Sequence, residues 1–331
     1  MTYLQLGNSD VKVTPISFGA WAIGGWMWGG SDREEAVRAL EASIDLGITS
    51  IDTAPVYGFG LSEEIVGEVT ALKRDKVQIM TKFGLHWDTS KGVLHFTTKN
   101  NEGIPVNIHK YASRESIIRE CEQSLKRLQT DYIDLYQIHW PDTSTAIEES
   151  MEALDRLLQQ GKILAAGVSN YSTGELMRAL NAIPIASNQV PYSMVERDIE
   201  QEMVPFCVDN NVSIIVYSPL QRGVLSGKFK PDHEFGKGDS RPASHFYRKN
   251  NIGTINAFLE ELKPLASEKN ASLAQVVIRW TLQRPGITTV LTGIRNEGQL
   301  QENAGTLLFE LSDEEMEFIN ARLERLALER D

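Results

Sequence analysis

Short apolar runs alternate with amphipathic segments of helical period along the chain, and this alternation limits the fold more than any other feature. We interpret the apolar runs as buried strands and the segments between them as helices. The strands are predicted to begin at Ile16, Ile48, Val77, Ile133, Ile163, Ile185, Val212 and Thr288. Eight strands in strict alternation with helices predict an α/β fold of the (β/α)8 TIM barrel type, because closure buries both faces of a parallel sheet.

The segments outside this alternation predict a hairpin, two long loops and a final helix. Residues 3–13 have the turn chemistry of a small N-terminal β-hairpin that caps the barrel. Residues 83–112 and 220–251 are long and polar, and they follow the third and seventh strands, so we expect loops that act as lids over the barrel mouth. Ser312 and Glu315 form a capping box that opens a C-terminal amphipathic helix.

Length and charge narrow the possible classes of protein. The chain has 331 residues, within the usual range for one α/β barrel, so we expect a single domain over residues 1–331. A net charge of -12 disfavours nucleic acid and anionic membranes as partners. No signal peptide or membrane-spanning run is evident, so we expect a cytoplasmic protein. We also expect a monomer, with an oligomer as the open alternative. Cys121 and Cys207 lie far apart in predicted helices and are expected to be buried thiols.

Three consecutive predicted strands end on residues that can carry chemistry. Asp52 closes the second strand and Tyr57 follows it, Lys82 closes the third strand, and His139 closes the fourth. Parallel strands of a barrel present their carboxyl ends at one mouth, so these side chains are expected to lie together. Each alone also fits a structural role: a helix cap, a loop aromatic, a solvated strand end and a core histidine. Taken together, they favour an active site.

This set of residues suits the reduction of a carbonyl group. Tyrosine has an ordinary pKa of about 10, and a cation within roughly 4 to 6 Å lowers it by about 1 to 3 units. We expect Lys82 to be that cation and Asp52 to hold its charge. His139 is placed to donate to a bound carbonyl oxygen or to orient it.

A carbonyl reductase needs a hydride donor, and the sequence contains neither of the common nucleotide-binding motifs. There is no P-loop, and the run from Gly58 to Glu63 lacks the third glycine of a Rossmann fingerprint. The standard phosphate site of a barrel lies after strands seven and eight. Residues 217–223 and 292–296 occupy those places and contain small residues plus Arg222 or Arg295. Both segments could equally be ordinary turns.

Several blocks in order along essentially the whole chain resemble the aldo-keto reductase family. The matching blocks are Ile51-Asp52-Thr53-Ala54-Pro55-Val56-Tyr57-Gly58, Thr81-Lys82, Ser124-Leu125-Lys126-Arg127-Leu128, Asp131-Tyr132-Ile133-Asp134-Leu135, Gln137-Ile138-His139-Trp140, Gly161-Lys162-Ile163, Gly167-Val168-Ser169-Asn170 and Tyr217-Ser218-Pro219-Leu220. Within the family, the chain is most similar to the bacterial general-stress and inositol-operon reductases.

The resemblance implies a barrel that binds NADPH without a Rossmann domain and reduces aldehydes or ketones to alcohols. It also implies that Tyr57 protonates the carbonyl oxygen, that Lys82 with Asp52 tunes Tyr57, and that His139 orients the substrate. The cofactor-binding positions that it implies are Trp21, Asp52, Ser169, Asn170, Gln189, Tyr217, Ser218, Pro219, Leu220, Arg222, Gly223, Gly293, Arg295, Gln299, Glu302 and Asn303.

Among these positions, the resemblance assigns Ser169, Asn170 and Gln189 to the carboxamide and Tyr217 to stacking on the nicotinamide. The loop after the seventh strand matches the pyrophosphate site, and the residues from Gly293 onward match the adenosine end. Gln299 departs from the pattern, because many mammalian-type members carry an arginine there for the adenosine phosphate.

Two other functions compete with carbonyl reduction. A regulatory or sensor protein that binds NADPH and turns over slowly would resemble the potassium-channel β subunits, but that branch replaces the tetrad histidine, and His139 is present here. A metal-dependent barrel hydrolase needs several His and Asp at strand ends, and of six histidines only His139 occupies one, so no metal is expected. The substrate stays open, because a pocket that many carbonyl compounds could enter is expected from Trp21, Trp26, Trp28, Trp87 and Trp140.

Overall fold

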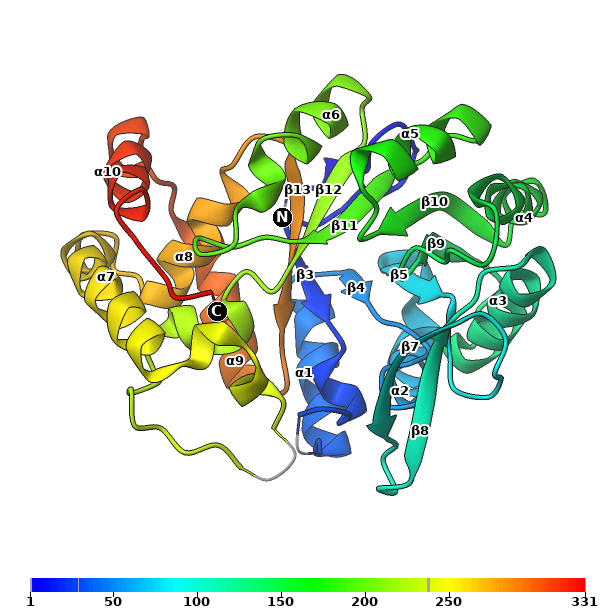
Figure 1. Ribbon diagram of the computed structural model, residues 1–331, viewed down its shortest axis with the longest axis horizontal. Coiled ribbons are helices and arrows are strands. Elements are labelled where there is room, and N and C mark those ends of the chain that lie inside the picture. Colours follow the sequence, from blue (N-terminus) through cyan, green and yellow to red (C-terminus); the bar gives the residue numbers. More distant parts are fainter. Residues whose placement is uncertain (1, 29, 237–238, 331) are drawn as a thin grey trace.

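The computed structural model describes residues 2–28, 30–236 and 239–330, and its strands form a closed barrel (Figure 1). Among these residues, eight parallel strands pair in the order β10-β11-β12-β13-β3-β4-β5-β9, and β9 returns to β10. They are β3 (Ile16–Gly19), β4 (Ser50–Asp52), β5 (Gln78–Phe83), β9 (Ile133–Ile138), β10 (Ile163–Ser169), β11 (Ser187–Pro191), β12 (Ser213–Tyr217) and β13 (Ile287–Gly293). The predicted (β/α)8 barrel is confirmed.

Helices surround the barrel and cover the outer faces of its strands (Figure 1). They are α1 (Arg33–Asp45), α2 (Leu61–Thr70), α3 (Arg114–Leu128), α4 (Ile147–Gln159), α5 (Thr173–Ala182), α6 (Met203–Asp209), α7 (Lys249–Glu268), α8 (Leu273–Leu282), α9 (Glu297–Gly305) and α10 (Asp313–Leu323). The expected C-terminal helix is α10, and Ser312 and Glu315 form its capping box. The residue pattern does not predict α7 or α9.

Helix α2 begins without a side-chain cap. The N-cap residue is Gly60, which makes no side-chain cap. Ser62 instead donates from its hydroxyl to the carbonyl oxygen of Ala20 at 2.8 Å, and this hydroxyl also lies 2.8 Å from Thr53 Oγ1. The side chain therefore joins α2 to the segments that follow β3 and β4, next to the barrel mouth.

The N-terminal end of the barrel is closed by an apolar plug, as the sequence predicted. Strands β1 (Leu4–Gln5) and β2 (Lys12–Val13) form an antiparallel hairpin, and Leu6 just after β1 and Val13 within β2 are fully buried. They pack in one cluster with Met80, Leu135, Ala165, Ala186, Ile215 and Leu291 from the barrel strands and their approaches. At the turn, Gly7 has a φ of +54°, and a Cβ there would lie 2.3 Å from the carbonyl oxygen of Ala186. Only glycine fits this close approach.

The two long segments that follow strands lie at the opposite end of the barrel (Figure 1). The first is not a loop, which corrects the expectation for residues 83–112. It forms an antiparallel sheet of β6 (Leu85–His86), β7 (Val93–Lys99) and β8 (Pro105–Lys110), with β8 in the middle. The described part of residues 220–251 contains short 3-10 turns at Gln221–Ser226, Arg241–Ala243 and His245–Tyr247.

The two cysteines lie in the core, as expected. Cys121 on α3 and Cys207 on α6 are fully buried and free. Burial raises the pKa of each thiol to about 12. Both therefore stay protonated near neutral pH and pack as small apolar side chains.

Candidate active site

The barrel brings Asp52, Lys82 and His139 together at its carboxyl end, as the order of the strands predicts. Asp52 is the last residue of β4, Lys82 is the fifth residue of β5, and His139 directly follows β9. These strands are neighbours in the barrel, and Lys82 is in register with Gln137, two residues before His139. Tyr57 reaches the same place from the loop between β4 and α2.

Lys82 is fully buried, and each of its three possible donor directions has a partner. Its Nζ lies 2.7 Å from Asp52 Oδ1, 3.0 Å from the carbonyl oxygen of Thr53 and 3.3 Å from Tyr57 Oη. Gln189 donates from Nε2 to the other oxygen of Asp52 at 2.8 Å. Since a buried charge is tolerated only when it is paired and hydrogen-bonded, this network accounts for an ammonium group in the barrel interior.

The pKa of Tyr57 does not follow the expectation from the sequence. Burial raises the pKa of Tyr57 well above its usual value, and the negative charge of Asp52 raises it further. The pKa of Tyr57 is therefore raised overall rather than lowered as expected, and burial is the largest cause. Burial also lowers the pKa of Lys82, against the opposing effect of Asp52. Tyr57 consequently holds its proton near neutral pH and can only donate it.

His139 is held as a neutral imidazole beside Tyr57. Burial lowers its pKa well below the usual value, and the positive charge of Lys82 and the nearby His95 lower it further. The two rings meet edge to face with centroids 5.7 Å apart. The backbone of His139 is fixed on both sides, since its N–H donates to Phe83 and its carbonyl accepts from Asn170 Nδ2, both at 3.0 Å.

The loop that carries Tyr57 is fixed by a close backbone contact. Gly58 has a φ of +67°, and a Cβ there would lie 2.3 Å from the carbonyl oxygen of Gly24. A Cβ on Gly24 would in turn lie 2.7 Å from the backbone of Tyr57. The two glycines let the loops after β3 and β4 touch, and this contact places the tyrosine over Lys82.

The predicted carboxamide residues form one hydrogen-bonded group next to the tetrad Asp52, Tyr57, Lys82 and His139. Tyr217 donates from Oη to Asn170 Oδ1 at 2.8 Å, and Asn170 Nδ2 lies 3.1 Å from Ser169 Oγ. Ser169 donates to the carbonyl oxygen of Gln189 at 2.8 Å. The group is joined to the tetrad twice, through the bond from Asn170 to His139 and through the bond from Gln189 to Asp52.

The loop after β12 has an unusual backbone, and its Arg222 is only partly satisfied, because Nη2 donates to Ser240 Oγ while Nε has no partner among the described residues. Ser218, Gln221 and Arg222 all have positive φ without being glycine, which marks stored strain of the kind found at ligand sites. The guanidinium of Arg222 lies 5.6 Å from the ring of Trp21 and 5.4 Å from that of Trp28. Its Nε and both indole nitrogens are buried without a hydrogen-bond partner among the described residues. Three such donors near one another suit an anionic or oxygen-rich ligand.

The predicted adenosine residues form a second group at the start of α9. The backbone N–H of Arg295 donates to Gln299 Oε1 at 2.9 Å, and its guanidinium is exposed. Glu302 accepts from Ser272 Oγ through its carboxylate, while Asn303 Nδ2 lies 3.5 Å from the carbonyl oxygen of Gly293. Among the described residues, this group makes no hydrogen bond to the tetrad.

Aromatic rings wall the space above the tetrad. Trp21 stacks on Tyr57 at 6.0 Å, and Trp26 contacts Phe59 at 5.6 Å and Phe96 at 6.1 Å. The predicted Trp87 and Trp140 belong to the same cluster. Phe59, His95 and Phe96 were not predicted from the sequence. His95 and Phe96 lie on β7, a strand that the residue pattern does not indicate.

Comparison with known proteins identifies the family to which this barrel belongs. The aldo/keto reductase family model matches residues 15–324. The chain belongs to the aldo/keto reductase family. It is 38% identical over 327 residues to the aldo-keto reductase YhdN of Bacillus subtilis (strain 168), a match covering 98% of this chain and 94% of YhdN.

Two further aldo/keto reductase relatives are informative. The NADH-specific methylglyoxal reductase of Escherichia coli (strain K12) is 33% identical over 332 residues, covering 98% of this chain and 99% of that protein. The solved structure of the glycerol dehydrogenase AKR11B4 from Gluconobacter oxydans has a TM-score of 0.89 at 36% identity, covering 99% of this chain and 97% of that chain. This member of the family is therefore an oxidoreductase.

The described residues of this aldo/keto reductase contain neither a metal-ligand cluster nor a membrane-spanning helix. Across residues 2–28, 30–236 and 239–330, no group of three or more His, Cys, Asp or Glu is arranged to hold a metal ion. Within the same ranges, none of the helices has both the length and the apolar character needed to cross a membrane.

Proposed function

We propose that this aldo/keto reductase reduces aldehyde or ketone carbonyls to alcohols with NADPH, and that Tyr57 is the general acid. One observation carries the proposal. The hydroxyl of Tyr57 lies 3.3 Å from the buried ammonium of Lys82, which is paired with Asp52 at 2.7 Å, at the carboxyl end of the barrel. A protonated phenol next to a fixed cation, with no activated nucleophile beside it, is suited to giving one proton to a carbonyl oxygen.

The residues present fit a nicotinamide cofactor. The unpaired donors near Arg222 and the strained loop from Ser218 suit the pyrophosphate, with Pro219, Leu220 and Gly223 shaping the same loop. Ser169, Asn170 and Gln189 offer amide and hydroxyl groups to the carboxamide, and Tyr217 offers a ring for stacking. Gly293, Arg295, Gln299, Glu302 and Asn303 are assigned to the adenosine end. When bound, NADPH supplies the hydride.

The side chains of the tetrad handle the proton. As the carbonyl carbon accepts the hydride, the oxygen gains negative charge and takes the proton from Tyr57 Oη. The phenolate left behind lies next to the Lys82 ammonium, which stabilises it, while Asp52 keeps that ammonium in place. Neutral His139 donates a ring N–H to the same carbonyl oxygen and sets its direction. The aromatic wall keeps water away and strengthens these interactions.

Turnover of carbonyl compounds tests the proposed reaction. Purified protein is assayed against a panel of aldehydes and ketones by the loss of cofactor absorbance, with NADPH and NADH in parallel and Lys82→Met as the inactive control. We expect reduction of several aldehydes by the wild type alone. Tight cofactor binding without turnover of any carbonyl compound would contradict the proposal and support a sensor.

We also propose that Arg295 gives a preference for NADPH over NADH. Its exposed guanidinium follows β13, where a barrel places its phosphate site, and can grip the 2′-phosphate with charge-assisted hydrogen bonds. Since such bonds contribute about 1.5 to 3 kcal/mol, Arg295→Ala should raise the Kd for NADPH roughly 10- to 150-fold. The Kd for NADH should hardly change. The NADH-specific relative makes this comparison necessary, and an equal loss for both cofactors would exclude Arg295 as the reader of the phosphate.

A further inference from the structure

His95 occupies an irregular position on β7 that turns its side chain toward the barrel mouth. In the pairing of β7 with β8, Leu94 opposes His109 and Phe96 opposes Ile108, so His95 is the extra residue of a β-bulge. A bulge breaks the alternation of side chains and re-aims the residues beside it. As a result, the adjacent His95 and Phe96 are both half-buried, whereas a regular strand would send them to opposite faces.

The ring of His95 meets the aromatic wall next to the tetrad. Its centroid lies 5.1 Å from that of Trp140 and 4.9 Å from that of Phe96. Trp140 directly follows His139 in the chain, and the charge on a protonated His95 would be felt by His139, whose pKa it helps to lower. The imidazole therefore belongs to the wall that faces the reacting carbonyl.

Both ring nitrogens of His95 are free to bind a ligand. Among the described residues, they make no hydrogen bond, and the ring has only aromatic contacts. Burial lowers the pKa of His95, and the charge of Lys110 lowers it further, so the ring is neutral near pH 7. A neutral imidazole has one N–H donor and one acceptor nitrogen. In a wall of tryptophan and phenylalanine, this is a polar group without a structural partner.

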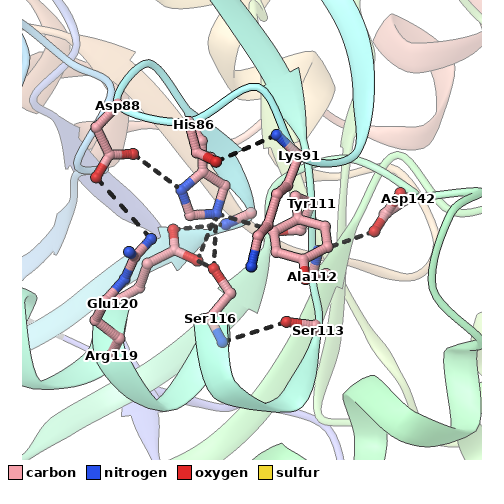
Figure 2. Close-up of polar contacts among 12 residues, drawn as sticks. His86, Asp88, Lys91, Tyr111, Ala112, Ser113, Ser116, Arg119, Glu120 and Asp142 are labelled. Carbon is pink, nitrogen blue, oxygen red and sulfur yellow. Dashed lines mark hydrogen bonds and ion pairs between the residues drawn. The ribbon is translucent and has the colours of Figure 1, made fainter.

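The sheet that contains β7 is joined to helix α3 by a buried polar cluster around His86 on β6 (Figure 2). His86 on β6 contacts Glu120 on α3 at 2.9 Å, and its Nε2 also lies 3.1 Å from Ser116 Oγ. Glu120 accepts from the backbone N–H of Gly84 at 2.9 Å. These bonds join the start of the sheet, at β6, to α3 at the edge of the barrel.

The other end of the sheet is tied to the loops around Tyr57. Asn101 Nδ2 donates to the carbonyl oxygen of Gly58 at 3.1 Å, and Trp26 Nε1 donates to Thr98 Oγ1 at 3.3 Å. Because the sheet is held at both ends, the position of His95 relative to Tyr57 is set by the fold. A fixed polar group beside the reacting centre is the arrangement that gives a binding site its specificity.

We infer that His95 is a specificity-determining residue that hydrogen-bonds a hydroxyl group next to the carbonyl of the substrate, so that the enzyme prefers hydroxyaldehydes and hydroxyketones to their unsubstituted analogues. This inference rests on the proposed carbonyl reduction. A hydroxyl can donate to one ring nitrogen or accept from the other, and a plain alkyl chain can do neither. The competing explanation is that His95 only fills space among the aromatic rings.

Two aldehydes with the same three-carbon skeleton separate these explanations. Glyceraldehyde carries one hydroxyl on the carbon next to the carbonyl and a second on the carbon beyond it, and propanal carries none. The variant His95→Phe keeps a ring for packing but loses both hydrogen-bonding atoms, while His95→Gln keeps a donor and an acceptor. Leu94→Gln, at the exposed neighbouring position, is the matched control.

We expect His95→Phe to lower kcat/KM for glyceraldehyde roughly 2- to 13-fold more than kcat/KM for propanal, the range for one neutral hydrogen bond. His95→Gln should recover part of the loss, and Leu94→Gln should match the wild type with both aldehydes. An equal loss for both aldehydes with His95→Phe, or no loss for either, would overturn this inference alone. A wild type that reduces neither aldehyde would overturn the proposed function and this inference with it.

Discussion

The two ends of the barrel are built from different kinds of contact. At the N-terminal end, the side chains of Leu6 and Val13 of the hairpin fill the barrel through apolar contacts. At the carboxyl end, the ammonium of Lys82 and the carboxylate of Asp52 are buried together, and the half-buried His139 lies beside them. Apolar packing stabilises a fold directly, whereas a buried ion pair seldom stabilises more than apolar side chains of the same size. The N-terminal end of the barrel therefore supplies stability, and the carboxyl end supplies the chemistry.

The largest expected effect comes from breaking the ion pair at the carboxyl end. Lys82→Met leaves Asp52 buried with the hydrogen bond from Gln189 but without its cation. Removal of one partner from a buried pair costs about 3 to 5 kcal/mol of unfolding free energy. The loss of the cation should also slow reduction, by about 10²- to 10⁴-fold.

Urea unfolding and kcat/KM measure the two losses in the Lys82→Met protein. Lys76→Met, at an exposed lysine just before β5, is the control and should change neither. A Lys82→Met protein with the stability and activity of the wild type would show that the pair is not the centre of the site.

The next effect is at the apolar end and concerns stability alone. Leu6→Ala should lower the free energy of unfolding by about 2 to 5 kcal/mol, because it removes buried methyl groups and leaves a cavity in the plug. Well below the unfolding midpoint, kcat/KM should equal that of the wild type. Leu4→Ala, at the half-exposed neighbouring position of β1, should have little effect on either quantity. Loss of activity in folded Leu6→Ala would show that the two ends are coupled.

The smallest effect on stability is expected at His86, which lies at the carboxyl end of the barrel but is not part of the tetrad. Burial opposes the charge of this side chain, but the hydrogen bond and charge of Glu120, with Asp88, raise the pKa of His86 overall. Because the pKa of His86 is higher in the folded state, the contribution of His86 to the free energy of unfolding is complete below the unfolded pKa of about 6.5. This contribution is lost as the pH rises through the folded pKa.

The free energy of unfolding, measured at several pH values, checks this sign. His86→Gln should be less stable than the wild type by about 1.5 to 3 kcal/mol near pH 5, and the difference should shrink at alkaline pH. A difference that grows with pH would contradict the assignment.

The sequence predicts the barrel well because its signal is repeated. Each strand is a short apolar run with a helix after it. The predicted number of eight strands is therefore correct even where the predicted ends of a strand differ from the observed ends, as in β11. The apolar pattern does not predict a helix where the composition of the segment is unusual for a helix. Helix α7 opens with Lys249 and two asparagines and contains Pro264, and α9 is short and contains Gly298, so neither has a clear helical pattern.

The candidate site is predictable to the extent that it follows from strand ends. Asp52, Lys82 and His139 meet because their strands are neighbours. The pKa of Tyr57 was not predictable, since it depends on the depth of burial, which the spacing of residues does not give. Nor was His95, because its direction comes from a bulge, and a bulge is fixed by register with β8 rather than by the residues of β7.

The role of Tyr57 as the proton donor is tested most directly by measuring kcat and cofactor affinity in Tyr57→Phe. This change removes only the hydroxyl 3.3 Å from Lys82 and leaves the ring that stacks on Trp21. If Tyr57 is the proton donor, kcat for the best aldehyde should fall about 10²- to 10⁴-fold, while the Kd for NADPH from a fluorescence titration stays near the wild-type value. A Tyr57→Phe protein with nearly unchanged kcat would contradict the central claim, because the proton would then have to come from another group.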